Sequence, residues 1–162
     1  MLKILKFTSL IIAMAISNFA KAELVIIGNT NYSGGQLDRS SVQKIFLGKS
    51  QSFPNGNKAT PANHAVGSPD RKEFFDSVLA MGESSHKRHW RKMLSTGKGV
   101  SPTELNNYKE VLRWVAENPN GIAYIDSRAV NDSVKVLLTI EDYSGFSNTE
   151  VSENDLSGSE NI

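Results

Sequence analysis

Three stretches of the sequence decide the fold: Val42-Gln43-Lys44-Ile45-Phe46-Leu47-Gly48-Lys49, Gly67-Ser68-Pro69-Asp70-Arg71-Lys72-Glu73-Phe74-Phe75 and Asn118-Pro119-Asn120-Gly121-Ile122-Ala123-Tyr124-Ile125. In the middle stretch a small residue precedes a serine at an N-cap position and a proline at the first helical position. This order is typical of a helix start, where unpaired N–H groups can hold an anion. The sequence therefore predicts an anion site at Ser68.

Strand and helix signals alternate on both sides of these stretches. Short apolar or β-branched runs predict strands at 24–28, 59–66, 122–125 and 134–138, the second as an edge or irregular strand because it contains Pro61. Helical spacing predicts helices at 37–46, from Ser68 onward, at 83–94 and from about Tyr108. Asp38 or Ser40 is expected to cap the first of them, and a capping-box pattern at 101–104 precedes the last. This alternation predicts an α/β layer fold.

The three stretches, in this order, resemble one lobe of the periplasmic phosphate-binding proteins of ABC transporters. The resemblance covers about Leu24 to Leu138 and implies a single lobe of the type II periplasmic-binding-protein-like fold, with a mixed sheet flanked by helices. In that family a Gly-Ser-Gly-Thr helix start, followed by a phenylalanine, holds phosphate through hydroxyl and N–H groups. Gly67, Ser68 and Phe74 match its spacing.

Other positions of the motif depart from the family pattern. His64 occupies the position of the family's charged arginine, Pro69 that of the second glycine and Asp70 that of the threonine. Proline removes an N–H donor and aspartate places a negative charge where an anion would rest. Arg71 offers a replacement positive charge.

The predicted ligand-binding residues are Ser68, Arg71, Gly67, Asp70 and His64. In the alternative interpretation, Ser68 to Asp70 only cap a helix and bind nothing, because such caps are common at helix starts.

The N-terminus has the pattern of a secretory signal peptide over residues 1–22. Lys3 and Lys6 form a positive region, residues 7–16 are apolar but too few to span a bilayer, and Ala20-Lys21-Ala22 fits a cleavage site. We therefore expect a mature chain that begins at Glu23 and is exported to the periplasm.

Composition limits the remaining possibilities. The absence of cysteine excludes thiol catalysis, thiolate metal sites and disulfides. Beyond the signal, 15 basic residues face 17 acidic ones, so nothing indicates nucleic-acid binding. We expect one domain over 23–143 and, because residues 144–162 are polar with few large apolar side chains, a disordered acidic tail there.

No sequence motif indicates catalysis, and the pattern predicts a protein that is not an enzyme and needs no cofactor. His86 and His89, with Glu83 one turn earlier, offer a metal site on one helix face, but the four cations at 87, 88, 91 and 92 favour a solvated basic face without metal. Trp90 has apolar neighbours, as does Trp114, and both are expected in the core together with Met93 and Leu94.

The functional prediction is an exported solute-binding-like protein for phosphate or a similar small oxyanion. The resemblance covers one lobe only, so half of the usual cleft is missing and affinity should be low unless a partner or a second copy covers the site. The alternative is a protein-interaction lobe that docks on a membrane transporter or sensor and has lost its ligand.

Overall fold

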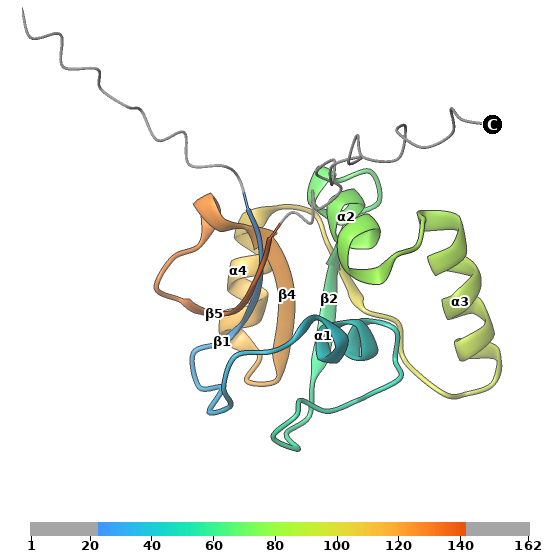
Figure 1. Cartoon of the computed structure of the whole chain (residues 1–162), viewed down its shortest axis with the longest axis horizontal. Helices are drawn as coiled ribbons and strands as arrows, with labels where there is room; N and C mark the ends of the chain where they lie inside the picture. Colours follow the sequence, from blue (N-terminus) through green and yellow to red (C-terminus); the bar gives the residue numbers. More distant parts are fainter. Residues whose placement is uncertain (1–22, 142–162) are drawn as a thin grey trace, which may run out of the picture.

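The computed structural model describes residues 23–141 as a layered α/β domain (Figure 1). Its elements, in chain order, are β1 (Leu24–Asn29), α1 (Arg39–Phe46), β2 (Thr60–His64), α2 (Pro69–Phe74) continued by a π-helical turn (Phe75–Leu79), α3 (Glu83–Ser95), β3 (Thr103–Leu105), α4 (Tyr108–Glu117), β4 (Gly121–Asp126), a 3-10 turn (Ser127–Ala129) and β5 (Val134–Ile140). No helix among these residues is both long and apolar enough to cross a membrane.

The five strands form one mixed sheet in the order β3-β2-β4-β1-β5. β2 runs parallel to β3 and β4, whereas β1 is antiparallel to β4 and β5. The register places Leu24, at the start of β1, opposite Ile140, at the end of β5. The predicted mixed sheet flanked by helices is therefore confirmed.

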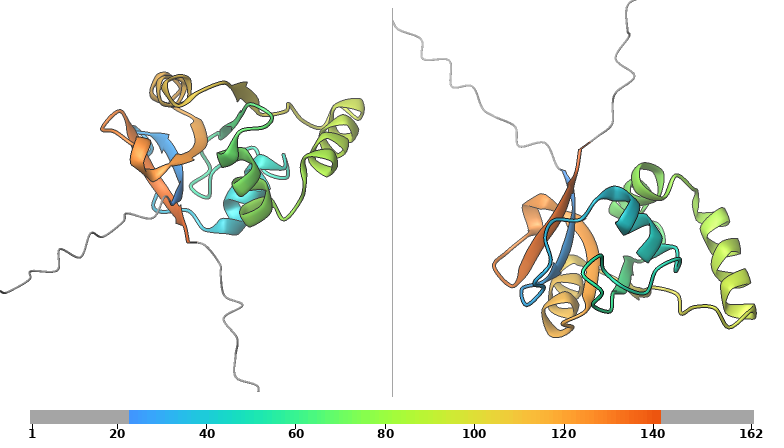
Figure 2. Two further views of the ribbon diagram at one scale, coloured as in Figure 1. Left: turned by 90° about the horizontal axis from the view of Figure 1, so that it is seen from above. Right: turned by 60° about the horizontal axis from the view of Figure 1, so that its bottom comes forward.

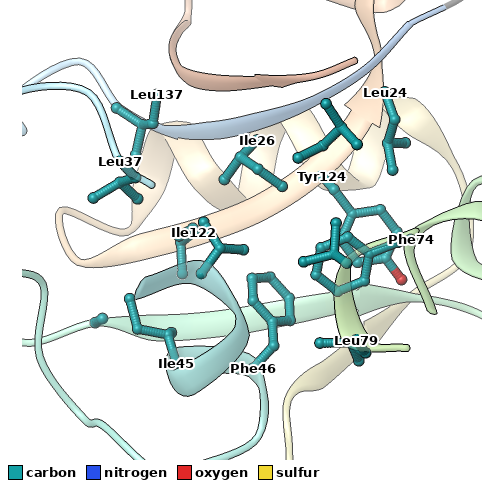
Figure 3. Packing of buried hydrophobic residues seen from close by; sticks show 14 of the residues in the cluster. Leu24, Ile26, Leu37, Ile45, Phe46, Phe74, Leu79, Ile122, Tyr124 and Leu137 are labelled. Atoms are coloured by element: carbon teal, nitrogen blue, oxygen red, sulfur yellow. The ribbon is translucent and has the colours of Figure 1, made fainter. Parts of the chain in front are cut away.

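Helices cover both faces of this sheet, and β1 contributes to the core on each face. Leu24 and Ile26 pack into a cluster with α1, α2 and the aromatic rings of Phe46, Phe74 and Tyr124 (Figure 3). The alternate residues of β1 pack on α4 through Val111 and Val115. Because both faces are covered, all six residues of β1 are buried, which explains its continuous apolar run.

The expected helix starts at 37–46 and at Ser68 are confirmed. Asp38 caps α1 by accepting a hydrogen bond from the N–H of Ser41 at 2.7 Å, and Ser68 caps α2. Gly48 follows α1 with a φ of 67°, in the left-handed region that ends helices, and Trp90 packs against it so closely that a side chain there would collide with the indole.

The expected capping box at 101–104 is wrong, because β3 occupies Thr103–Leu105. The true cap lies one turn later: the side chain of Asn107 accepts from the N–H of Glu110 at 3.0 Å, and Glu110 accepts from the N–H of Asn106 at 2.9 Å. Two capping patterns compete in this sequence, and pairing of residues 103–105 with β2 selects the second.

Pro61 predicts an edge or irregular strand, and the second form is correct. β2 is not at the edge, since it lies between β3 and β4, but it pairs with β4 only at Thr60 and Pro61 and with β3 only from Ala62 to His64. The N–H of Thr60 donates to Asn120 at 2.8 Å, on the β4 side. Neighbouring residues in a strand point their N–H groups to opposite sides, so the missing donor of Pro61 faces β3. Pairing with β3 begins only at Ala62, and no ladder hydrogen bond is lost.

Two further expectations lie outside the described residues, namely the signal peptide at 1–22 and the disordered acidic tail at 144–162. The helix expected at 83–94 is confirmed as α3, and Trp90 is buried as expected. The burial expected for Leu94 is wrong, because its side chain is 51% exposed.

Candidate functional site

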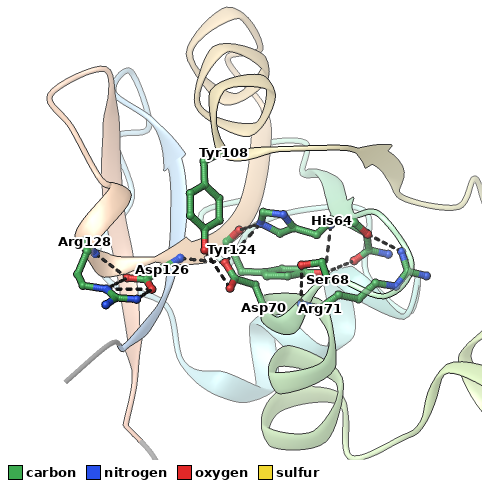
Figure 4. Close-up of polar contacts among 9 residues, drawn as sticks. His64, Ser68, Asp70, Arg71, Tyr108, Tyr124, Asp126 and Arg128 are labelled. Carbon is green, nitrogen blue, oxygen red and sulfur yellow. Dashed lines mark hydrogen bonds and ion pairs between the residues drawn. The ribbon is translucent and has the colours of Figure 1, made fainter.

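The candidate site lies where the three parallel strands end. β2, β4 and β3 run in the same direction, so their C-terminal residues His64, Asp126 and Leu105 lie along the same side of the sheet. We call this side, formed by the strand ends and not by an edge strand, the carboxyl edge. Open α/β sheets bind ligands at this border, beyond the carboxyl ends of their strands. The Ser68 turn follows β2 and therefore lies at the carboxyl edge (Figure 4).

Ser68 and Gly67 form the turn between β2 and α2. The Ser68 hydroxyl accepts a hydrogen bond from the N–H of Arg71 at 3.4 Å, so it is engaged as the N-cap of α2. Gly67 is exposed and has a φ of 91°, a conformation that side chains rarely permit. The turn thus presents backbone to solvent, while its serine serves the short helix that follows.

Arg71 is buried, and its side chain donates four hydrogen bonds to protein groups. Its side chain is bonded to Glu83, through Nε at 2.9 Å and Nη2 at 2.5 Å, and to Glu104, through Nη1 at 2.9 Å. Nη1 also donates to the carbonyl of His64 at 2.6 Å, and the guanidinium lies 4.9 Å from the centre of the Phe75 ring. These contacts hold α2, α3, β2 and β3 together.

The pKa values of Arg71 and Glu83 agree with a charged pair that is held within the domain. Burial disfavours the charged guanidinium, but the hydrogen bonds to Glu83 and Glu104 outweigh burial, and the pKa of Arg71 is raised. The hydrogen bond from Arg71 lowers the pKa of Glu83 in turn. Arg71 therefore carries a positive charge that two carboxylates of the same domain already neutralise.

Asp70 is buried and points across the carboxyl edge to neighbouring elements (Figure 4). Its Oδ1 accepts from the Tyr108 hydroxyl at 3.1 Å, and its Oδ2 accepts from the N–H of Asp126 at 3.1 Å. Burial and the charge of Asp70 raise the pKa of Tyr108 to about 12, so Tyr108 stays a hydrogen-bond donor. Asp70 thus joins the starts of α2 and α4 to the end of β4.

His64 is buried at the end of β2. Its Nε2 lies 2.9 Å from the carbonyl oxygen of Tyr124, which can only accept, so Nε2 carries the hydrogen. Its backbone N–H donates to the Tyr124 hydroxyl at 3.2 Å. Burial lowers the pKa of His64 and favours the neutral ring, although Asp70 lies 3.8 Å away and opposes this shift. His64 therefore supplies no positive charge at neutral pH.

Sequence reasoning missed Tyr108, Asp126 and Arg128 as members of this edge. Arg128 forms an ion pair of 2.5 Å with Asp126, and the hydrogen bonds from Arg128 lower the pKa of that carboxyl group. Polar residues directly after a predicted strand were the available signal, since Asp126 ends β4.

The structure thus brings all five predicted residues to one edge, where the charged ones are already paired. Among the described residues this edge carries four carboxylates, Asp70, Glu83, Glu104 and Asp126, against two guanidinium groups. A net negative border repels a small anion. What it leaves exposed is the Gly67 turn and the apolar surface of Val66 and Tyr108, which are 64% and 40% exposed.

The histidines of α3 lie elsewhere and form no metal site. His86 is buried and accepts from the indole N–H of Trp90 at 3.1 Å, so the expected solvated face does not include it. Glu83 is bonded to Arg71 instead. Across residues 23–141, no three His, Cys, Asp or Glu side chains are grouped so that they could bind a metal ion.

Three solved structures that share this fold come from proteins described as phosphate receptors or phosphate-binding components of transporters. A phosphate transport receptor from Vibrio cholerae is 17% identical, with a TM-score of 0.57 over 72% of this chain and 45% of its own. A proposed phosphate ABC transporter substrate-binding protein from Clostridium perfringens, solved with bound phosphate, has a TM-score of 0.58 and 17% identity over 72% and 44%. PstS from Borrelia burgdorferi has a TM-score of 0.54 and 13% identity over 72% and 46%.

These similarities confirm the predicted fold, which is that of a single lobe of the phosphate-type binding proteins. The chain spans less than half the length of each of the three proteins. No protein-family model and no curated protein matches the sequence. Because identity is low, the similarity establishes the fold and leaves ligand and partner to be inferred from the site.

Proposed function

We propose that this chain is an exported, non-catalytic binding lobe that docks on a membrane transporter or sensor through its carboxyl edge. The observation that carries the proposal is the state of Arg71, which is 3% exposed and bonded to Glu83 and Glu104. The positive charge that an oxyanion would need at Ser68 is thus already neutralised by carboxylates of the same domain. A lobe of this type with its charges satisfied internally is suited to meeting another protein surface.

The exposed surface at the same edge supports this proposal. Val66 and Tyr108 follow the ends of β2 and β3 and are exposed, although both are large and apolar. Valine and tyrosine side chains in such positions contribute to interface cores once a partner excludes water. In phosphate-binding proteins with two lobes a second lobe would face this edge, and here a partner takes its place.

A second candidate function is weak binding of phosphate or a similar oxyanion at the Ser68 turn. It is favoured by the fold shared with a protein solved with bound phosphate, and by the exposed backbone at Gly67. The four carboxylates at the carboxyl edge oppose it. Arg71 would have to leave Glu83 and Glu104 to reach an anion.

Site-specific cross-linking distinguishes the candidates, and the absence of native cysteine makes it straightforward. Val66→Cys places a thiol on the carboxyl edge, and Val136→Cys, on exposed β5, is the matched control. We expect a maleimide cross-linker in intact cells to join Val66→Cys, and not Val136→Cys, to one integral membrane protein. Equal labelling at both positions would contradict docking at this edge.

Calorimetric titration with phosphate and with sulfate tests the second candidate. The docking proposal expects no saturable heat at low salt, where screening is least. Saturable heat that is lost in Ser68→Ala, with the fold retained, would instead support oxyanion binding. Export itself is checked by mass spectrometry of the periplasmic fraction, in which the chain should begin at Glu23.

A further inference from the structure

The exposed face of α3 carries a concentrated positive charge, far from the β5 side of the domain (Figure 2). Residues 84–103 include five Lys or Arg residues and no Asp or Glu. Four of them form a stripe on consecutive turns of α3 and are exposed: Lys87, Arg88, Arg91 and Lys92. We call this stripe the basic face. Within residues 23–141 none of the four forms an ion pair with a carboxylate.

The basic face repels itself. Lys87 and Arg91 are four residues apart, as are Arg88 and Lys92, and like charges at this spacing destabilise a helix by about 0.2–0.5 kcal/mol per pair. Glu83 at the N-terminus of α3 offsets only the charge of Lys87, and the hydrogen bonds of Glu83 go to Arg71. An acidic segment lying along the basic face would remove the repulsion.

An open groove adjoins the C-terminal half of α3. It measures about 810 Å³ and is lined by apolar side chains that include Ile45, Pro61, Trp90 and Met93, with Lys58 and Lys98 also lining it. Val100, which also lines the groove, is 85% exposed, and Leu94, next to Met93 in the sequence, is 51% exposed. Trp90 and Met93 lie on the side of α3 opposite the basic face, so an acidic segment with interspersed apolar residues contacts both surfaces by passing around the C-terminal end of α3, near Lys98.

We propose that the C-terminal segment of the same chain, residues 142–162, binds the basic face and the groove. The segment carries five carboxylates and no Lys or Arg, whereas residues 23–141 carry 15 basic residues against 12 acidic ones. Its apolar residues are spaced among the acidic ones: Phe146, Val151, Leu156 and Ile162. The carboxylates of the segment complement the basic face, and its apolar residues complement the groove.

The segment is long enough to reach α3. It starts after Glu141, just beyond β5, and its 21 residues span up to about 70 Å when extended. A domain of this size is only about 35 Å across. A short flexible link gives an effective concentration of about 1 mM, so even a millimolar contact is about half occupied. This inference does not depend on the proposed function, because the basic face and the groove lie beyond the first turn of α3, whose Glu83 belongs to the carboxyl edge.

Paramagnetic broadening in the mature chain, residues 23–162, tests the contact. Ser157→Cys carries the only thiol, and a nitroxide there broadens amide signals that it approaches. We expect broadening of residues 87–100 at about 0.01 M salt, and its loss at about 1 M, because the Debye length falls from about 30 Å to about 3 Å. The same loss should follow when Glu150, Glu153, Asp155 and Glu160 are changed to their amides.

A matched pair of variants assigns the contact to α3. Arg91→Ala/Lys92→Ala removes two charges of the basic face and should reduce the broadening of residues 87–100 at least about two-fold, by shifting a half-occupied contact. Lys109→Ala/Arg113→Ala removes two exposed charges of α4, which stand near Glu110 and Glu117, and should leave it unchanged.

Three outcomes would overturn the proposal. One is broadening of residues 87–100 that is absent or indifferent to salt. Another is broadening that appears only when a labelled chain is mixed with an isotopically labelled second copy, because the contact is then between chains. The third is a set of α3 amide signals that do not respond to the segment but shift when vesicles containing about one-third phosphatidylglycerol are added. The basic face would then be a membrane-binding surface.

Discussion

The carboxyl edge and the basic face of α3 use charge in opposite ways. At the carboxyl edge the guanidinium of Arg71 is 3% exposed and lies between two carboxylates, whereas the four cations of the basic face are exposed and form no ion pair within residues 23–141. The first arrangement stabilises the domain and the second leaves charge for a partner. Position in a binding-protein fold therefore does not by itself make a charged residue a ligand-binding one.

The largest effect that tests this comparison is expected for Arg71→Ala. Removing the guanidinium leaves the His64 carbonyl without its donor and separates α3 from α2, so we expect a loss of about 3 kcal/mol of unfolding free energy. Glu83 and Glu104 still reach water, which keeps the loss at the lower end for a broken buried pair. Urea unfolding measures it.

The control for this change is Arg91→Ala, which removes an equal charge from the basic face. Exposed substitutions of this kind change stability by less than about 0.5 kcal/mol. Similar losses for both variants would contradict the distinction between a structural and an available cation.

The second effect is a dependence of stability on pH through His86. Burial, followed by the nearby charge of Arg71, lowers the pKa of His86 to about 4 from 6.5. The unfolded chain therefore binds a proton more readily, and stability present above about pH 6.5 is lost as the pH falls toward 4, by at most about 3 kcal/mol. Urea unfolding at pH 4.5 and 7 measures this loss.

His86→Gln should flatten this dependence while keeping an acceptor for the indole of Trp90. His89→Gln, on the same helix, is the matched control and should retain the dependence. A residual slope is expected in both variants because burial also lowers the pKa of His64. An unchanged slope in His86→Gln would show that another group titrates.

A smaller loss is expected for Asp70→Asn, about 1–2 kcal/mol, because an amide can accept at only one of the two positions that Asp70 fills. Asp76→Asn is the control, since Asp76 is exposed and pairs only with Lys72 on the same helical surface among the described residues. Thermal unfolding of the two variants compares a buried carboxylate with an exposed one. Equal midpoints would mean that Asp70 does not join α4 and β4 in solution.

The smallest effect is expected on deletion of residues 144–162. A contact that is half occupied stabilises the folded state by only about 0.4 kcal/mol, which shifts the thermal midpoint by about 2 °C. Differential scanning calorimetry at low salt measures this shift. A loss of several degrees would mean that these residues pack firmly on the domain.

Local signals predicted much of the fold. The apolar run at Leu24 and the caps at Asp38 and Ser68 act within a few residues, so the strand and both helix starts were predictable. The failure at Ser101 arose where two local signals compete and sheet pairing decides between them. The five candidate residues lie close together in the sequence, between His64 and Arg71, so the sequence alone already placed them at one turn.

The state of the candidate site could not be predicted in the same way. Glu83 and Glu104 lie 12 and 33 residues beyond Arg71, and no local pattern links the three. The fold determines whether an arginine beside a helix start faces a ligand or a carboxylate. Tyr108 contacts Asp70 across 38 residues and was missed for the same reason.

The pairing of β1 with β5 also affects how the domain can be joined to other proteins. Leu24 lies opposite Ile140, so the chain enters and leaves the domain at neighbouring points of one sheet. A unit whose two ends are adjacent can be inserted into a loop of a host protein without stretching either junction. The lobe can therefore be transplanted as a single block. Because Leu24 also pairs with Asp126, an unrelated scaffold fused at these ends would stand beside the carboxyl edge and leave α3 accessible.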